Sequence, residues 1–101
     1  MPPSHDVAPP KKLARLEVEP GYTAGFGRDV VKAYRKRLAV IRAAVDERAF
    51  YAAKSLHYEK LKGDRSHQRS MRLNDQFRLV LEIDTDAAGR MIVVVSVEDY
   101  H

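Results

Sequence analysis

The sequence predicts a small α+β domain in which N-terminal helices pack on an antiparallel sheet of three to four strands. Two observations predict this order. In the first half, apolar residues recur every three or four positions, which is typical of a helix with one buried face. From Ser55 onward, short runs rich in β-branched and aromatic residues are separated by Asn, Asp or Gly, which is typical of strands and turns. The length of 101 residues suits one such domain.

Residues 1–10 contain four of the five prolines, so we expect a flexible arm there and a single domain over residues 11–101. Lys11–Val18 could form a short helix or an edge strand. Leu13 and Leu16 are three positions apart, which favours the helix.

The clearest predicted element is a helix from about Arg28 to Asp46. Its apolar stripe consists of Val30, Tyr34, Leu38, Ile41 and Val45. Gly27 or Asp29 could begin this helix, and the Asp29 carboxylate would suit the positive end of its dipole. A further short helix is expected over Glu47–Lys54, with Phe50 docked on the core.

Four extended segments are expected in the second half: Leu56–Leu61, Ser70–Leu73, Phe77–Ile83 and Met91–Val97. The last is apolar on both faces through Val95, which suits a central strand. A three-residue loop, Asn74–Gln76, would pair Met71 with Leu79 on one face and Arg72 with Arg78 on the other. A two-residue loop would mix apolar and charged side chains, so we prefer the first register. Two opposed arginines are unfavourable unless an anion lies between them, which indicates anion binding.

The basic residues are unevenly distributed. The chain has 18 Lys and Arg against 14 Asp and Glu, with a pI near 9.5. Residues 28–42 and 60–78 each contain six basic residues, whereas residues 79–101 contain five acidic residues and one basic residue. This pattern predicts a polarised surface that could bind a polyanion.

Several classes of function are excluded or disfavoured by composition. The absence of cysteine excludes disulfides, thiol catalysis and thiolate metal sites. The four histidines have no metal-ligand spacing, and we expect no metal or cofactor. No Gly-rich phosphate loop is present. No apolar run is long enough to span a membrane, and the first residues lack the apolar core of a secretory signal, so we expect no membrane association.

The basic strand region and the final three residues could together cleave RNA. Cleavage by the 2′-hydroxyl needs groups that move protons and cations that hold the phosphate oxygens. A sufficient set would be Arg78, Asp99, Tyr100 and His101, with Lys62 and Arg72 as further phosphate ligands. The alternative interpretation is that the tail is a solvated chain end and the arginines are ordinary surface residues.

Two stretches, Glu59–Ile83 and Val95–His101, resemble the HigB branch of the RelE/ParE toxin superfamily. The matching motifs are the turn Leu61–Arg65, the hairpin Ser70–Arg78 and the terminal Asp99–His101, in the family's order. The resemblance implies a RelE-like fold with a twisted sheet. It also implies a type II toxin that cuts translated mRNA in the ribosomal A site without a metal, through a 2′,3′-cyclic phosphate.

Carried over to this sequence, the resemblance implies catalytic roles for Arg78, Asp99, Tyr100, His101 and Lys62. We expect RNA contacts from Lys60, Arg65, Arg69, Arg72 and Phe77. Some relatives have His where this chain has Glu59, so Glu59 or the nearby His57 is a possible accessory residue. The family usually opens with a strand, which is expected to be missing or too short to pair in the Pro-rich residues 1–10.

The implied partners are a HigA-like helix-turn-helix antitoxin, the 30S ribosomal subunit with its rRNA, and mRNA, with operator DNA reached only through the antitoxin. The implied location is the bacterial cytoplasm. Two other functions stay open, because a fold does not fix a function. The chain could be a ParE-type inhibitor of DNA gyrase without catalysis, or a degenerate member that acts only as an antitoxin-bound regulator.

Overall fold

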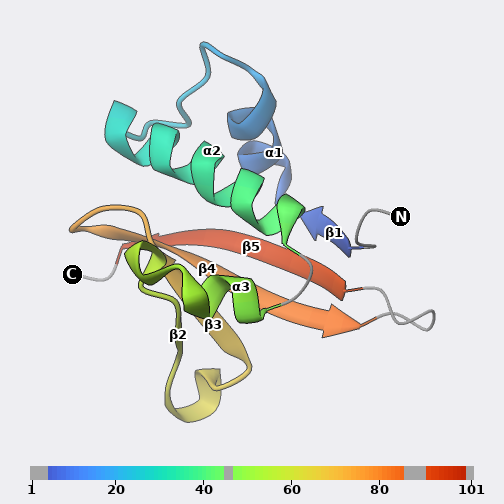
Figure 1. Ribbon diagram of the computed structural model, residues 1–101. Helices are drawn as coiled ribbons and strands as arrows, with labels where there is room; N and C mark the ends of the chain where they lie inside the picture. Colours follow the sequence, from blue (N-terminus) through green and yellow to red (C-terminus); the bar gives the residue numbers. More distant parts are fainter. Residues whose placement is uncertain (1–4, 45–46, 86–90, 100–101) are drawn as a thin grey trace.

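A computed structural model of the chain describes residues 5–44, 47–85 and 91–99 (Figure 1). It is an α+β domain in which the N-terminal helices cover one face of a single sheet, as predicted. The strands are β1 His5–Ala8, β2 Glu59–Lys60, β3 Gln68–Arg72, β4 Phe77–Thr85 and β5 Met91–Asp99. Their order across the sheet is β1-β5-β4-β3-β2. Strands β2 to β5 pair antiparallel, and β5 lies between β1 and β4, in the central position expected for it.

The prediction of a flexible arm over residues 1–10 was wrong for residues 5–8, which form β1. This strand pairs parallel to the start of β5, with Val7 opposite Val93. Because the prolines at positions 9 and 10 follow the strand, they remove no donor from its hydrogen-bond ladder. A first strand is therefore present at the sheet edge, where we expected none long enough to pair.

The helices follow the predicted order. They are α1 Lys11–Val18, α2 Arg28–Ala43 and α3 Arg48–Ala52, with short 3-10 turns η1 Lys54–Leu56 and η2 Gly63–Arg65. Helix α2 begins where predicted, with Gly27 as its N-cap, but ends at Ala43 rather than Asp46. Ala44 adopts an extended conformation, which ends the helical hydrogen bonding. The predicted end at Asp46 and the stripe residue Val45 lie outside the described residues.

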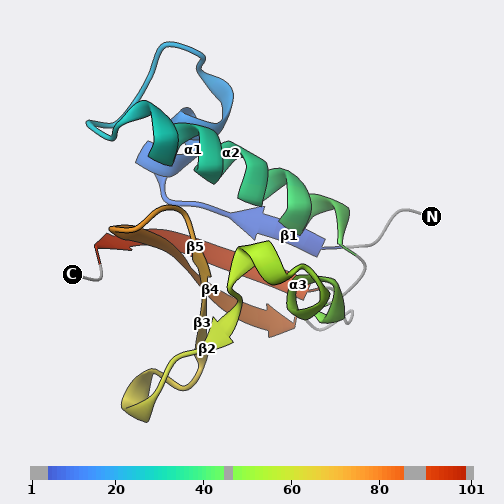
Figure 2. The ribbon, with the colours of Figure 1, turned by 60° about the vertical axis from the view of Figure 1, so that its left-hand side comes forward.

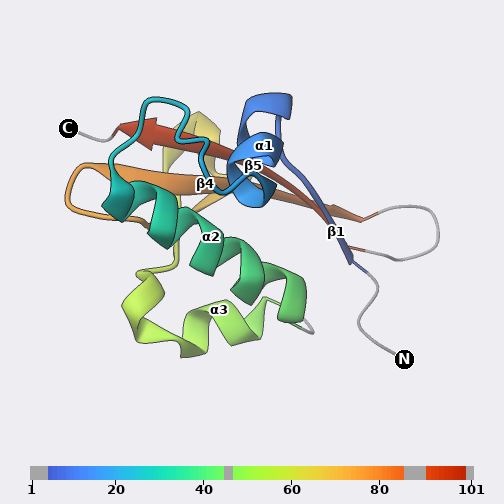
Figure 3. The same ribbon diagram turned by 90° about the horizontal axis from the view of Figure 1, so that it is seen from above.

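The core lies between the helices and one face of the sheet. Seen from above in Figure 3, and from a second side in Figure 2, α1 and α2 lie over the strands. The predicted stripe residues Tyr34, Leu38 and Ile41 have no exposed surface, and neither has Phe50 of α3. None of the helices among the described residues is both long enough and apolar enough to cross a membrane.

Polar contacts join α1 to α2. The Tyr34 hydroxyl donates to the backbone oxygen of Leu13 over 3.1 Å, and the guanidinium of Arg42 forms two 2.8 Å hydrogen bonds with the carboxylate of Glu17. Burial raises the pKa of Tyr34 above its ordinary value, so this hydroxyl stays protonated as a donor.

The hairpin of β3 and β4 has the predicted register. Met71 lies opposite Leu79, and Arg72 lies opposite Arg78. Since side chains alternate along a strand, this register places the apolar pair beneath the helices and the arginine pair on the other face, here called the open face. The site described next is on the open face.

Candidate active site

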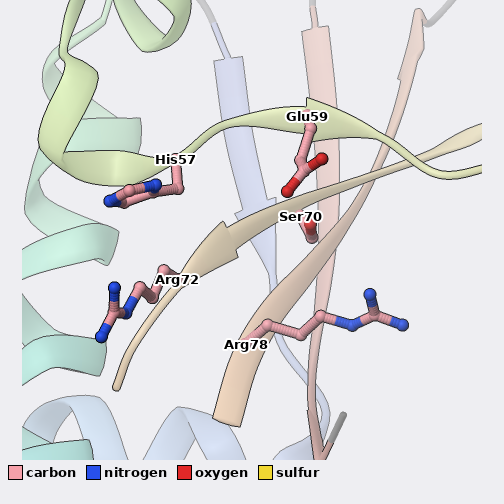
Figure 4. Close-up of a pocket in the computed structure, with 5 residues that line it drawn as sticks. All are labelled: His57, Glu59, Ser70, Arg72 and Arg78. Atoms are coloured by element: carbon pink, nitrogen blue, oxygen red, sulfur yellow. The ribbon is translucent and has the colours of Figure 1, made fainter. Parts of the chain in front are cut away.

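The open face carries a polar cleft of about 210 Å³ between β2, β3 and β4. Figure 4 shows the side chains that line it: His57, Glu59, Ser70, Arg72 and Arg78. Register explains why they meet. Glu59 lies opposite Ser70 and Arg72 lies opposite Arg78, so residues distant in sequence share one face of three adjacent strands.

A second hollow of about 320 Å³ adjoins this cleft. Its lining residues are Glu59, Lys60, Leu61, Lys62, Arg65 and Arg78. Because Glu59 and Arg78 line both hollows, the two form one trough. Among the described residues that line the trough, Glu59 is the only acidic one, and the cations outnumber it. The trough therefore favours a bound anion and places a single carboxylate beside it.

The two opposed arginines are each paired with a carboxylate. Arg72 forms an ion pair with Asp75 in the hairpin loop, and Nη2 of Arg78 lies 3.5 Å from Oε1 of Glu98 on β5. In Figure 4 their guanidinium groups extend in opposite directions. The repulsion expected from their register is thus relieved within the protein itself. Each guanidinium remains partly exposed at the cleft, with side-chain exposures of 42% for Arg72 and 25% for Arg78.

Glu98 organises the cations on the open face. Its carboxylate forms two hydrogen bonds with Arg65, at 3.0 and 2.5 Å, and Arg65 also donates from Nε to the side chain of Gln68 over 2.7 Å. Because Gln68 is on β3 and Glu98 is on β5, the Arg65 side chain crosses β4 between them. The two hydrogen bonds from Arg65, and then the single one from Arg78, hold the pKa of Glu98 below its ordinary value.

Tyr58 anchors the segment that supplies His57 and Glu59. Its side chain is 9% exposed, and its hydroxyl donates to Oε2 of Glu47 over 2.6 Å. Burial, followed by this hydrogen bond, raises the pKa of Tyr58. Nε of Arg69 donates to the same Glu47 oxygen over 3.1 Å. The Tyr58 ring packs 5.3 Å from the Phe50 ring and 4.8 Å from the Tyr51 ring, measured between centroids.

The backbone at His57 is strained. Its φ of 49° and ψ of 48° lie in the left-handed region, which few non-glycine residues adopt. This conformation ends η1 and redirects the chain into β2, so that an exposed imidazole lines the cleft. Strain of this kind is common at functional sites, where surrounding contacts maintain it.

The structure separates the residues that the sequence grouped as catalytic. Arg78 lines both hollows, and Lys62 lines the second. Asp99 lies opposite Phe77 at the end of β5, one position from Glu98 and therefore on the other face, where its carboxylate accepts a 2.8 Å hydrogen bond from Gln76. Tyr100 and His101 lie outside the described residues.

The residues predicted to contact RNA also differ in their surroundings. Lys60, Arg65 and Arg72 line the trough. Arg65 and Arg69 already bind Glu98 and Glu47, respectively. Phe77 packs edge-to-face against Phe26, 5.4 Å between ring centroids. The trough thus contains only part of the predicted RNA-binding set.

The sequence did not point to two residues of the open face, Ser70 and Glu98, as parts of the site. Ser70 is only 5% exposed and lines the cleft, and Glu98 links two predicted cations. Glu98 was counted only as part of the acidic end of the chain. Its position opposite Arg78 follows from the register of β4 and β5. The alternation of both strands could have indicated that register.

Candidate metal ligands do not gather in the described part of the chain: no group of three or more His, Cys, Asp or Glu side chains comes together there. The groups available at the trough are therefore guanidinium and ammonium cations, one carboxylate, one imidazole and one hydroxyl. Such groups can hold a phosphate and accept or donate protons.

Comparison with known proteins gives a match at the level of structure. No family model matches the sequence, and no curated protein matches it. Among solved structures, a YoeB/ParE toxin from Agrobacterium tumefaciens superposes with a TM-score of 0.55 and 11% identity, over 95% of this chain and 99% of that one. At this identity the similarity establishes the fold, and this chain has the fold of that toxin.

Proposed function

We propose that the chain is the toxin of a type II toxin–antitoxin system and that it cleaves mRNA in the ribosomal A site. The toxin motifs in the sequence and the fold shared with a YoeB/ParE toxin support this proposal. The observation that carries it is the trough on the open face, which is lined by two arginines from adjacent strands together with one carboxylate and one imidazole.

Each group has a role in the proposed reaction. Arg78 holds the non-bridging oxygens of the scissile phosphate and stabilises the charge that develops on them, and Arg72, whose guanidinium extends the other way, is a further phosphate ligand. The Glu59 carboxylate accepts the proton of the 2′-hydroxyl, whose oxygen attacks phosphorus. The new bond joins the 2′-oxygen to phosphorus, the bond from phosphorus to the 5′-oxygen breaks, and a 2′,3′-cyclic phosphate forms. Of the three terminal residues that the sequence grouped as catalytic, Tyr100 and His101 are the proposed source of the proton that the leaving 5′-oxygen takes up, since Asp99 lies on the other face of the sheet.

The proposed partners follow from the same function. The ribosome presents the message, and the cations Lys60 and Lys62 contact RNA phosphates next to the cleft. We expect cleavage of free RNA to be weak, because a small domain contributes few of the contacts that position the message. A helix-turn-helix antitoxin would bind the toxin and connect it to operator DNA.

Arg78→Ala is the direct test. Expressed in bacteria, the native chain should arrest growth, and primer extension on translated mRNA should reveal new 5′ ends that the variant does not produce. Arg15→Ala is the matched control, since Arg15 is an exposed arginine of α1 that is paired with Glu19 and is outside the trough. Full activity of Arg78→Ala would contradict the proposal. If expression of the native chain produced DNA breaks without mRNA cleavage, the chain would instead be a gyrase inhibitor.

The role of the terminal residues needs a separate test. Deleting His101 should abolish cleavage on ribosomes and leave the melting temperature unchanged. Unchanged cleavage by the truncated chain would remove this residue from the mechanism, and the proton for the 5′-oxygen would then have to come from elsewhere, with His57 the first residue to examine.

A further inference from the structure

A second basic surface lies on the helical layer. A groove of about 440 Å³ runs between α2 and the connection that precedes it, which contributes Pro20 and Thr23. Four cations of α2 line it: Arg28, Lys32, Arg35 and Lys36. It shares no lining residue with the trough. In Figure 1 the connection between α1 and α2 lies at the top of the molecule and β2 lies at the bottom.

Three of these cations are not neutralised. Arg28, Lys32 and Lys36 are exposed, and none of them forms an ion pair with any residue that the structure describes. In the same helical layer, by contrast, Arg15 and Arg42 each bind a glutamate. Like charges four positions apart on a helix repel one another and destabilise it. An anion bound along the groove would remove that repulsion.

The fourth cation shapes the groove. Arg35 donates from Nε to the backbone oxygen of Leu16 and from Nη2 to that of Glu19, each over 2.9 Å. These bonds tie the end of α1 to α2 and hold the connecting segment beside the helix. Arg35 therefore contributes a wall of the groove, and the other three cations remain available to a ligand.

The spacing of the free cations suits an extended polyanion. Positions 28, 32 and 36 are four residues apart, so the helical rise places them about 6 Å apart in a row about 12 Å long. An amphipathic acidic peptide would also need an exposed apolar anchor point. Of the two apolar residues that line the groove, Val31 is only 7% exposed and Pro20 offers a single small ring, and the large exposed apolar residues among those described, Val18, Val40 and Tyr51, are not part of its lining.

We propose that this α2 groove, defined by Arg28, Lys32 and Lys36, binds the phosphate backbone of a single RNA strand. The contact is electrostatic and independent of base sequence. It goes beyond the proposed function, because the groove is remote from the trough and would bind RNA whether or not the chain cleaves it.

The test measures binding to a 12-nucleotide 2′-O-methyl RNA oligonucleotide of mixed sequence. This probe lacks the free 2′-hydroxyl, so binding is measured without cleavage. The double variant Lys32→Ala/Lys36→Ala should make the plot of log association constant against log salt concentration less steep, with a slope smaller in magnitude by about 1.4. This change corresponds to about 25-fold weaker binding at 0.1 M salt. Lys11→Ala/Lys12→Ala is the matched control, since it removes two exposed lysines of α1 outside the groove and should leave both values nearly unchanged.

Two outcomes would overturn the proposal. In the first outcome, the groove variant and the control variant lose RNA affinity equally, which would mean that binding depends on net charge alone. In the second outcome, poly-L-glutamate at equal charge concentration displaces the oligonucleotide from the native protein but not from the groove variant. That result would assign the groove to an acidic protein partner. Cleavage of translated mRNA by the native chain and by Arg78→Ala, measured separately, shows whether the proposed function holds independently of the groove.

Discussion

The two faces of the sheet use the same strands for different purposes. Beneath the helices, Met71, Leu79 and Leu81 have no exposed surface and pack in one continuous core. On the open face, Arg72 and Arg78, each next to one of those residues in sequence, line a polar cleft. Substitutions at neighbouring positions should therefore have unlike consequences. Changes on the covered face should reduce stability, and changes on the open face should reduce activity.

The largest effect on activity is expected for Glu59→Gln. This change keeps the size of an exposed side chain but removes the only carboxylate among the described residues that line the trough. Loss of a general base lowers the rate by roughly 10²- to 10⁴-fold. Single-turnover cleavage of mRNA on ribosomes would measure the rate, and thermal unfolding should show an unchanged melting temperature.

Asp64→Asn provides the matched control for Glu59→Gln. Asp64 is an exposed acid in the nearby turn η2, and it lines neither hollow, so its amide variant should cleave at the native rate. If Glu59→Gln were fully active while His57→Ala was not, the imidazole rather than the carboxylate would be the base.

The largest effect on stability is expected for Leu79→Ala on the covered face. Removing a fully buried leucine side chain leaves a cavity and lowers the free energy of unfolding by about 2–5 kcal/mol. Urea denaturation would measure this loss, and the neighbouring Arg78→Ala should show a much smaller one. A larger loss for Arg78→Ala would mean that the open face, rather than the core, determines stability.

Elements with a local signal could be predicted from the sequence. The stripe of Val30, Tyr34 and Leu38 indicated α2, and the need to keep apolar side chains on one face determined the register of Met71 with Leu79. A slip of one residue would have reversed every side chain of the hairpin, so only one register was consistent.

Features that depend on a distant partner could not be predicted. Residues 5–8 became a strand because the edge of β5 offers hydrogen-bond partners that lie more than 80 positions away in sequence. The carboxylate of Glu47, which accepts hydrogen bonds from Tyr58 and Arg69, had no signal of its own. The position of Asp99 apart from Arg78 follows from strand alternation once β5 is known to continue through this residue.

An intermediate effect on stability is expected from substituting two buried tyrosines, Tyr34 in the helical layer and Tyr58 beside the trough. Tyr58→Phe removes the hydrogen bond to Glu47, and Tyr34→Phe removes the one to the Leu13 carbonyl. Each should lower the free energy of unfolding by about 1 kcal/mol. Only Tyr58→Phe should also lower kcat for cleavage, by several-fold with little change in KM, because Tyr58 fixes the segment that presents His57 and Glu59.

Activity measurements on the two tyrosine variants at matched temperature below both melting transitions would test this difference. If both variants lost the same fraction of activity, the effect would reflect general loosening of the fold, and Tyr58 would have no positioning role. Glu47→Gln should reproduce the kinetic effect of Tyr58→Phe, since it weakens the same hydrogen bond from the other side.

The smallest effect is expected from the acid titration of Glu98. Arg65 and Arg78 lower its pKa in the folded state relative to the unfolded state, where the pKa of a glutamate is about 4.3. The folded state therefore binds this proton less readily, so the ion pairs contribute stability above the unfolded pKa and lose it as the pH falls through the lower folded pKa. Glu98→Gln should be slightly less stable than the native chain near pH 7 and equally stable at strongly acidic pH. The difference is small because these side chains are partly exposed to solvent.

Urea denaturation of both proteins across this pH range would isolate Glu98 from the other carboxylates, because only the difference between the two curves is interpreted. Arg65→Gln should remove most of the same pH-dependent difference, and the double variant should lose little more than either single variant, since both changes break one pair. Additive losses would mean that Glu98 and Arg65 act separately. Arg78, which Glu98 also contacts, would then be the partner that lowers its pKa, and Glu98→Gln should change the position of that guanidinium and reduce cleavage.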